Sequence, residues 1–565
     1  MKVIPFFILL FTFGTTCFSQ NIHLKIIGST PSENKVIDSL KYNSIPTNVK
    51  NCNDELKTIA ERLSKIGYIE NQLLENTKKN DSTYIATFIL GDKIKFTHIN
   101  ISKNYELKEI IALEKNKDSI VLAYSETEPF LNTTLQKLEQ NGFAFAKLKL
   151  TNIKRKNNSL YTELQFESGQ QRKLNAIVVQ FVESNKKNSF PEGHLKQMNR
   201  KYRNSTFNQE IVRKIHDEFE KFGFVNQIKK PEILFTKDTT MVYVYLEKRK
   251  SNTFDGFIGF TKKESDKLTL NGYLDLSLEN TIKAGEEFSL YWKSDGNNQK
   301  TFKASVDLPY IFKSPIGLKA QINIFKQDSI FQNTKTAIDL GYFLDYKTRI
   351  YLGYQATESS DIQSTNNSII SDYTNSFLTT NLEYSRQDYI NTTFPKKTTI
   401  SIIMGQGNRK TTDLVETAGK SKQAFININA MHNFYLNPKN CININYQNYF
   451  LKSDTYIINE LYRFGGTKSI RGFAENSLQA NFMTAIITEY RYIISPDLYL
   501  HSILDYGYYK DNTTNYETTL TGIGLGIGLR TKNGNLKLNV SNGRNKNETF
   551  QFSNTIININ YNIEF

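Results

Sequence analysis

From Phe254 to the end of the chain, apolar and polar residues alternate with a period of two in one segment after another. In the stretch GLKAQINIF (317–325), every second residue from Leu318 to Ile324 is apolar, and the residues between them are Lys, Gln and Asn. Because successive side chains of a β-strand point to opposite faces, each segment is predicted to be a strand with one apolar and one polar face. Such a strand separates an apolar medium from an aqueous one.

Sixteen segments of this kind follow one another, the third at 282–294 and the last at 551–565. Connections after odd segments include ESSDIQSTNNSIISD and GQGNRKTTDLVETAGKS, whereas those after even segments include KSP, LNPKN, SPD and TKNG. Long connections on one side and short turns on the other are typical of an outer-membrane barrel. An even count also brings the last strand beside the first, so we predict an all-β barrel of sixteen antiparallel strands over 254–565.

Residues 1–19 have the pattern of an export signal, with Lys2 before the apolar run VIPFFILLFTF and small residues near the cleavage site. Lipidation at Cys17 is the alternative reading of this segment. Beyond residue 19, no run reaches the roughly 18 apolar residues of a membrane helix, so any span must be built from strands. Only 39% of the residues are hydrophobic, as expected when alternate strand residues face water.

Before the barrel, three similar stretches each combine a helix with an apolar stripe, a Gly-aromatic pair and onward strands. The pairs are Gly67-Tyr68, Gly142-Phe143 and Gly223-Phe224. Each glycine suits the left-handed residue that ends a helix. We therefore expect three tandem α+β modules over 20–93, 94–172 and 173–250, with pieces of one larger domain as the alternative.

The stretch RFGGTKSIRGFAENSL (463–478) lies between the eleventh and twelfth segments and has neither period. Glu489 and Asp505 follow on the next two segments, nearly opposite each other and on the polar face. Two carboxylates this close repel each other unless a cation lies between them. Arg471 is the candidate, because a guanidinium can bind carboxylates through two parallel hydrogen bonds. We expect the loop to fold back into the barrel and to place Arg471 between the two acids.

Glycines permit this course of the chain. Gly465, Gly466 and Gly472 allow the tight backbone that a re-entrant loop requires. In the fourteenth segment, TGIGLGIGLR, four glycines share one face: Gly522, Gly524, Gly526 and Gly528. Since glycine weakens a strand, this stripe indicates that another backbone approaches the wall from inside, although a low-complexity strand without a packed loop is the alternative.

The paired glycines followed by an RGF core resemble the sixth-loop signature of the BamA/TamA superfamily of outer-membrane assembly factors, and the three modules resemble its POTRA domains. The residues that carry the resemblance are Gly465, Gly466, Ile470, Arg471, Gly472 and Phe473. It implies that Glu489 and Asp505 hold the arginine in the lumen. Three modules are nearer to the TamA-like branch than to the five-module BamA-like branch, and the branch stays open.

The resemblance also implies a function, a location and partners. The chain would lie in the bacterial outer membrane with its modules in the periplasm, receive unfolded β-barrel clients and insert them through a seam between the first and last strands. We expect that seam to involve Gly256, Gly259, Ile563 and Phe565, because strand glycines weaken a ladder and an open edge can pair with an incoming strand. A terminal phenylalanine also resembles the signal by which barrels are themselves recognised. A periplasmic or inner-membrane accessory subunit is a further possible partner.

Other classes of function fit less well. We expect no enzyme activity, because the sequence has no GxSxG elbow and no Ser-His-Asp grouping. The six histidines are scattered without ligand spacing, so we expect no metal site and no cofactor. The formal charge of +15 comes with interspersed acids, which favours lipid headgroups over nucleic acid. A two-partner-secretion transporter, which exports a protein across the outer membrane, and a passive porin or adhesin remain as alternatives.

Overall fold

The computed structural model describes residues 22–80, 82–101, 105–111, 117–181, 190–262, 268–294, 299–363, 370–388, 391, 393–411, 420–532 and 534–565. The predicted export signal lies outside these residues. The described residues form two compact bodies. One contains the described residues up to Lys173 together with Ser205–Glu210, and the other contains Leu174–Asn204 and Ile211–Phe565.

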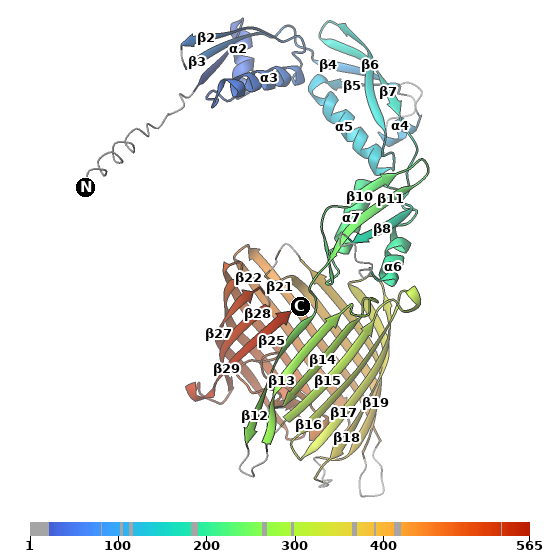
Figure 1. Cartoon of the computed structure of the whole chain (residues 1–565), viewed down its shortest axis with the longest axis vertical. Helices are drawn as coiled ribbons and strands as arrows, with labels where there is room; N and C mark the ends of the chain where they lie inside the picture. Colours follow the sequence, from blue (N-terminus) through green and yellow to red (C-terminus); the bar gives the residue numbers. More distant parts are fainter. Residues whose placement is uncertain are drawn as a thin grey trace, which may run out of the picture. The chain divides into compact units, whose positions relative to one another are not determined.

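Three small sheets, each with two helices, precede the barrel (Figure 1). The first has the order β1-β3-β2, the second β5-β4-β7-β6 and the third β10-β11-β8, with β9 paired to β11. In each sheet the first strand of the unit is parallel to the last one, since β1 pairs with β3, β4 with β7 and β8 with β11. The three units therefore share one topology: a strand, helices, and an antiparallel pair whose last strand lies beside the first.

The bounds of these elements are as follows. The first unit has β1 (His23–Gly28), α2 (Pro31–Ser39), α3 (Val49–Lys65), β2 (Gln72–Asn80) and β3 (Thr83–Ile89). The second has β4 (Phe96–Asn100), α4 (Tyr105–Ile110), β5 (Ser119–Ala123), α5 (Tyr124–Gln140), β6 (Lys147–Lys156) and β7 (Ser159–Glu167). The third has β8 (Ala176–Phe181), α6 (Glu192–Tyr202), α7 (Gln209–Phe219), β9 (Val225–Gln227), β10 (Glu232–Phe235) and β11 (Thr240–Lys248).

The expected glycine caps occur in two of the three units. Gly67 and Gly142 have φ angles of +110° and +92°. The backbone amide after each glycine donates to a carbonyl of the last helical turn, as in a Schellman motif. Gly223 differs, because α7 has already ended at Phe219 and this glycine has no left-handed φ. It lies instead against the carboxylate of Glu279, where a side chain would collide.

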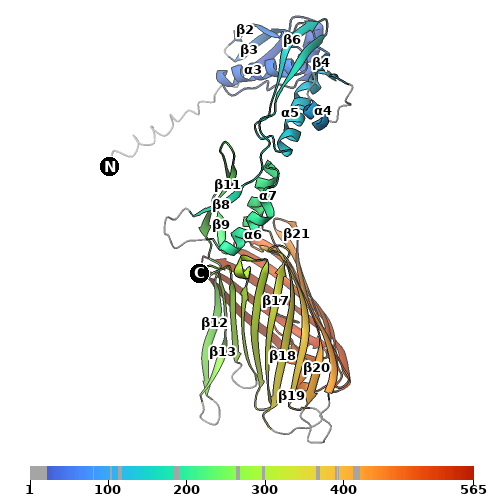
Figure 2. The same ribbon diagram turned by 90° about the vertical axis from the view of Figure 1, so that its right-hand side faces the viewer.

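Sixteen antiparallel strands close into a barrel, which confirms the predicted count and closure. Figure 2 shows β17 to β20 side by side on one wall. The first eight strands are β12 (Thr253–Lys262), β13 (Leu268–Glu279), β14 (Glu287–Ser294), β15 (Gln299–Leu308), β16 (Ile316–Gln327), β17 (Phe331–Phe343), β18 (Thr348–Asp361) and β19 (Tyr373–Gln387). The others are β20 (Lys396–Thr411), β21 (Lys420–Asn437), β22 (Asn440–Ser453), β25 (Phe482–Ser495), β26 (Leu498–Asp511), β27 (Tyr516–Thr531), β28 (Gly534–Asn545) and β29 (Thr555–Glu564).

Two strand starts differ from the sequence prediction by more than two residues. β14 begins at Glu287 rather than at 282, because the preceding turn holds Asn280 and Lys283 at positive φ and cannot pair. β29 begins at Thr555 rather than at 551. The expected contrast between long connections after odd strands and short turns after even strands holds only in part. The connection 328–330 follows the fifth strand and is as short as a turn, whereas 388–395 follows the eighth strand and is longer than a turn. The longest connection, 454–481, joins β22 to β25 as expected.

Alternation along the strands gives the barrel an apolar outer face and a polar inner one. Large apolar side chains are exposed on the strands from β17 to β29, among them Ile338, Leu340, Leu378, Leu504, Tyr506 and Leu525. Polar and charged side chains are buried inside, among them Asp339, Asn381, Arg409, Asn443, Glu489 and Asp505. No helix among the described residues is long and apolar enough to cross a membrane.

Candidate functional site: the re-entrant loop and the barrel seam

The connection 454–481, here called the re-entrant loop, has structure of its own. It contains one 3₁₀ turn, η2 (Ile458–Glu460), and a short hairpin of β23 (Tyr462–Phe464) and β24 (Leu478–Ala480). The tip between the hairpin strands holds the RGF residues. Side chains of this loop contact inward-facing residues of β13, β14, β20, β25 and β26, so the loop lies within the barrel.

Arg471 joins the loop to two neighbouring strands. Its Nε and Nη2 donate to the two carboxylate oxygens of Asp505 at 2.8 and 2.6 Å, and its Nη1 donates to Glu489 at 2.5 Å. Its backbone amide donates to Asp505 as well, at 3.0 Å, and Nη2 also reaches the Thr488 carbonyl. All three charged side chains are almost fully buried. The expected juxtaposition is therefore present; the register pairs Asp505 with Ile487, so the two acids are diagonal neighbours.

Glu489 belongs to a larger network than the sequence suggested. Arg491 lies 2.7 Å from it and Lys537 of β28 lies 2.8 Å from it, in addition to Arg471. Among the described residues, Arg471 is the only cation that pairs with Asp505. The two acids therefore depend on Arg471 to different degrees, a difference that mutation can test.

Apolar packing fixes the residues on both sides of Arg471. Ile470 is buried in a cluster with Phe464, Met483, Ala485, Tyr509 and Leu520. Gly472 has φ +89°, and its backbone lies so close to Gly543 of β28 that neither position could carry a side chain unchanged. Gly465 and Gly466 also have positive φ, as the predicted tight turn requires.

The glycine stripe of β27 contacts several different groups. Gly522 lies directly against the carbonyl of Arg471, so the loop backbone reaches the wall there. Gly526 and Gly528 are covered instead by the rings of His501 and Tyr499, and Gly524 lies against β28. Only the first glycine of the stripe meets the loop, because neighbouring strands of the same wall fill the space beside the others.

A second buried ion pair holds the other end of the loop, and sequence reasoning missed it. Arg409 of β20 pairs with Glu460, both almost fully buried, and also donates to Thr455. Next to it, Asn459 donates to Ser359 and to the carbonyl of Ser371, both at 2.8 Å. No sequence spacing could have indicated this pair, because Arg409 is one of many cations on the inward faces. We call Arg409, Glu460 and Asn459 the second anchor.

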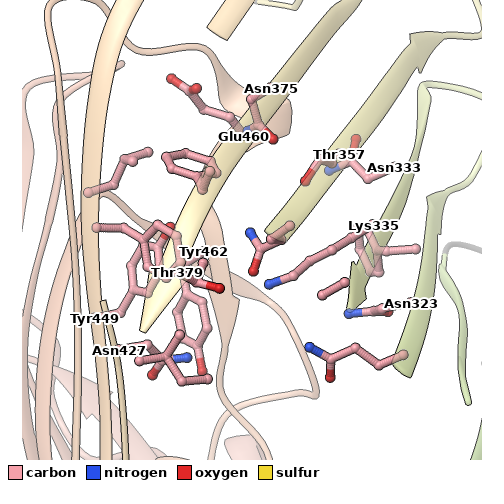
Figure 3. A pocket seen from close by; sticks show the side chains of 18 of the residues that line it. Asn323, Asn333, Lys335, Thr357, Asn375, Thr379, Asn427, Tyr449, Glu460 and Tyr462 are labelled. Atoms are coloured by element: carbon pink, nitrogen blue, oxygen red, sulfur yellow. The ribbon is translucent and has the colours of Figure 1, made fainter. Parts of the chain in front are cut away.

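Between the second anchor and the opposite wall lies a polar cavity of about 380 Å³. Figure 3 shows Lys335, Asn323 and Asn333 on one side facing Tyr462, Tyr449 and Asn427 on the other. Lys319 and Glu383, which also line the cavity, form an ion pair of 2.7 Å. The mixture of amides, lysines and tyrosines is that of a hydrated interior, so the loop does not fill the lumen.

The barrel closes through a seam between β12 and β29 that is far shorter than the pairing of any other two neighbouring barrel strands in the described residues. Only Thr253 with Glu564 and Phe254 with Ile563 are paired there among the described residues. By contrast, β12 pairs with β13 over ten residues. Side-chain contacts extend the seam, since the carboxylate of Asp255 accepts from the backbone amide of Tyr561 and the side chain of Tyr273 on β13 is hydrogen-bonded to that of Asn560 on β29.

The predicted seam residues lie in or beside this region. Ile563 pairs with Phe254, and the amide of Phe565 donates to Asn252 at 3.0 Å. Gly256 and Gly259 lie on β12 beyond the paired positions, opposite Leu274 and Asn271 of β13. Added to Gly256, a side chain would collide with the backbone of β13.

At the short-turn end of the barrel, aromatic rings bury His194 of α6. The rings are Phe190, Phe222 and Phe224 of the third α+β unit and Tyr310 and Tyr346 of two barrel turns. Within the described part of the chain, neither ring nitrogen of His194 has a hydrogen-bond partner. Burial, with a contribution from Arg349, lowers the pKa of His194 to about 3, and burial raises that of Tyr310 to about 12. His194 therefore packs as a neutral ring between the unit and the barrel.

Metal-binding clusters of three or more His, Cys, Asp or Glu side chains are absent from the part of the chain that the structure describes. Cys52 and Cys441 are buried free thiols.

Several solved structures are similar to this chain in fold. BamA from Haemophilus ducreyi lacking POTRA domains 1-3 has a TM-score of 0.48 at 16% identity, covering 82% of this chain and 99% of that one. CdiB from Acinetobacter baumannii has a TM-score of 0.49 at 12% identity (84% and 90% covered), and CdiB from Escherichia coli has 0.49 at 12% (90% and 98%). No family model and no curated protein sequence matches. At such identities and scores, the function has to be argued from this chain's own residues.

Proposed function

We propose that this chain is an outer-membrane protein assembly factor that receives unfolded β-barrel clients and inserts them through the seam between β12 and β29. The observation that carries the proposal is the seam itself. Only two residue pairs join β12 to β29 there among the described residues, although each strand is long enough for about ten residue pairs. An unpaired strand edge is a template for another strand, and natural proteins rarely leave one open without a use. A passive pore has no need of such an opening.

The location follows from the wall of the barrel. Exposed leucines, isoleucines and tyrosines lie along its strands from β17 to β29, while its interior is polar, which is the pattern of a barrel in lipid. A sixteen-stranded barrel of this kind belongs in the bacterial outer membrane, and residues 1–19 would direct its export. The part of the chain before the barrel, 20–250, would lie in the periplasm.

The three α+β units would act as POTRA domains over 20–93, 94–172 and 173–250. Their common topology supports this role, and each has strands at the edge of a small sheet where an extended client could add. In the first unit, β2 is such an edge strand, and all nine of its residues are exposed. Three units are the basis for placing the chain nearer to a TamA-like than to a BamA-like branch.

The Arg471 cluster, formed by Arg471, Glu489 and Asp505, would hold the re-entrant loop in the position that an active barrel needs. It contains no reacting group, so its contribution is structural: it fixes the loop beside the last strands, where clients would enter. The chemistry of insertion is hydrogen-bond exchange between strands, and it requires neither cofactor nor metal.

A disulfide across the seam tests the proposal. With the native cysteines replaced by serine, Phe254→Cys and Ile563→Cys lie opposite each other at the seam. Purified protein in liposomes is given an unfolded outer-membrane barrel, and insertion is followed by heat-modifiable mobility of the client. Oxidation should abolish insertion and reduction should restore it. A matched pair on the closed wall, Leu382→Cys with Ile402→Cys, should have no effect.

Equal insertion by the oxidised and reduced seam variants would refute lateral insertion. Secretion of a partner protein through the lumen is the competing function, and it makes the opposite prediction. In that case, depletion of the protein would stop export of one secreted protein and leave the set of outer-membrane barrels unchanged.

A further inference from the structure

The re-entrant loop contacts the barrel on both sides of the seam. On the side of the last strands, Gly472 lies against Gly543 of β28, and Arg471 is bound to β25 and β26. These contacts fix the tip of the loop to the wall that ends at β29. If they were the only ones, the loop would move with that wall and leave the seam unaffected.

On the side of the first strands, the same tip makes two ion pairs. Lys468 Nζ lies 3.0 Å from Asp275 of β13, and Glu475 lies 3.3 Å from Lys293 of β14. The ammonium of Lys468 also lies over the ring of Tyr291, 4.9 Å from its centre. The carbonyl of the next loop residue, Asn476, accepts from Gln299 of β15 at 3.4 Å. Within eight residues, the chain therefore passes from one side of the seam to the other and back.

The exposure of these ion pairs suits a contact that can be broken and formed again. The side chain of Lys468 is 73% exposed and that of Asp275 39% exposed, whereas the Arg471 cluster is buried. Exposed ion pairs contribute little individually and weaken with salt, whereas buried ones are costly to break. The pair of Glu475 and Lys293 is partly exposed, at 25% and 32%, so both ties to the first strands are more exposed than the Arg471 cluster that attaches the loop to the last strands.

We propose that Lys468 and Glu475 form a strap across the inside of the seam, and that breaking their ion pairs with Asp275 and Lys293 is a step in opening it. The strap holds β13 and β14 to the last strands at a place where β12 and β29 share almost no backbone hydrogen bonds. Both residues are positioning residues. As a step in client entry the strap rests on the proposed function, whereas its effect on the seam does not.

Charge reversal tests the strap without any client. Glu475→Lys replaces an attraction to Lys293 by a repulsion and should speed amide hydrogen exchange in peptides covering Thr253–Lys262 and Thr555–Glu564 by about two- to five-fold, as expected for a partly exposed pair. Adding Lys293→Glu should restore the wild-type rate. A matched control, Glu358→Lys on the outward face of β18, should leave exchange at the seam unchanged.

Salt and a milder variant provide independent readouts. Raising sodium chloride to about 1 M should speed seam exchange in the wild type and have little effect in Lys468→Gln with Glu475→Gln, which has no strap charges to screen. The proposal is overturned if Glu475→Lys leaves seam exchange at the wild-type rate, or if Lys293→Glu fails to restore it. If exchange responds as expected but client insertion does not depend on the seam disulfide, the strap stands and the proposed function fails.

Discussion

Replacing Arg471 by alanine is expected to leave a barrel that inserts into the membrane but is less stable and poorly active. The change removes the only cation that pairs with Asp505 among the described residues, while Glu489 keeps Arg491 and Lys537. The backbone amide of residue 471 can still donate to Asp505. The loss therefore falls mainly on one buried carboxylate.

The magnitude follows from the bonds that are lost. Two charge-assisted hydrogen bonds to Asp505, at 2.8 and 2.6 Å, disappear. Each such bond is worth about 1.5–3 kcal/mol. Leaving one partner of a buried ion pair without its counter-charge typically costs about 3–5 kcal/mol, in agreement with that sum. Arg471→Lys should recover part of this free energy, because an ammonium is a point charge and cannot bind both oxygens in a fork.

Urea unfolding of the barrel in liposomes, followed by tryptophan fluorescence and heat-modifiable mobility, measures the loss. Arg463→Ala is a matched control on the same loop. Arg463 lies over the rings of Phe325 and Phe331, 6.0 and 5.6 Å from their centres, and among the described residues it forms no ion pair within 4 Å, its electrostatic partner Asp511 being more distant. Its cost should therefore stay near 1–2 kcal/mol, or about the value of its two cation–π contacts. Wild-type stability and activity of Arg471→Ala would refute the latch.

Three further predictions concern other parts of the chain. Arg409→Ala should release the second anchor and leave Glu460 buried and unpaired, at a cost of about 3–5 kcal/mol in the same unfolding assay; a loss below about 1 kcal/mol would contradict it. Gly472→Ala should prevent the loop from seating, because its φ is +89° and a side chain would collide with Gly543; limited proteolysis should then cut the loop, and an uncut loop would count against this reading. Lowering the pH should undock α6 from the barrel turns, because the pKa of His194 is reduced to about 3. The free energy that the neutral ring contributes to packing is fully present above about pH 6.5 and falls by about 1.4 kcal/mol per pH unit as the pH falls toward 3. Hydrogen exchange in α6 should rise in this window and should not do so in His194→Phe.

The number and order of the barrel strands could be predicted because period-two alternation is a local property of each strand. Arg471 and its acids could be chosen for a similar reason. Glu489 and Asp505 lie on consecutive strands joined by a short turn, so reflection about that turn brings them together without knowledge of the rest of the barrel. The predicted cap at Gly223 is absent because α7 already ends at Phe219, and this glycine instead contacts Glu279, more than fifty residues away in the chain.

Hydrophobic period and glycine placement act over a few residues, so a closed barrel preceded by α+β units could be predicted from the chain alone. The way in which the loop is held could not, because Arg409 meets Glu460 and Asp275 meets Lys468 across the lumen, from segments far apart in the chain. The seam was decided in the same way. Its two residue pairs depend on the accumulated tilt and stagger of the fourteen intervening strands. No single segment of the sequence encodes that accumulated geometry.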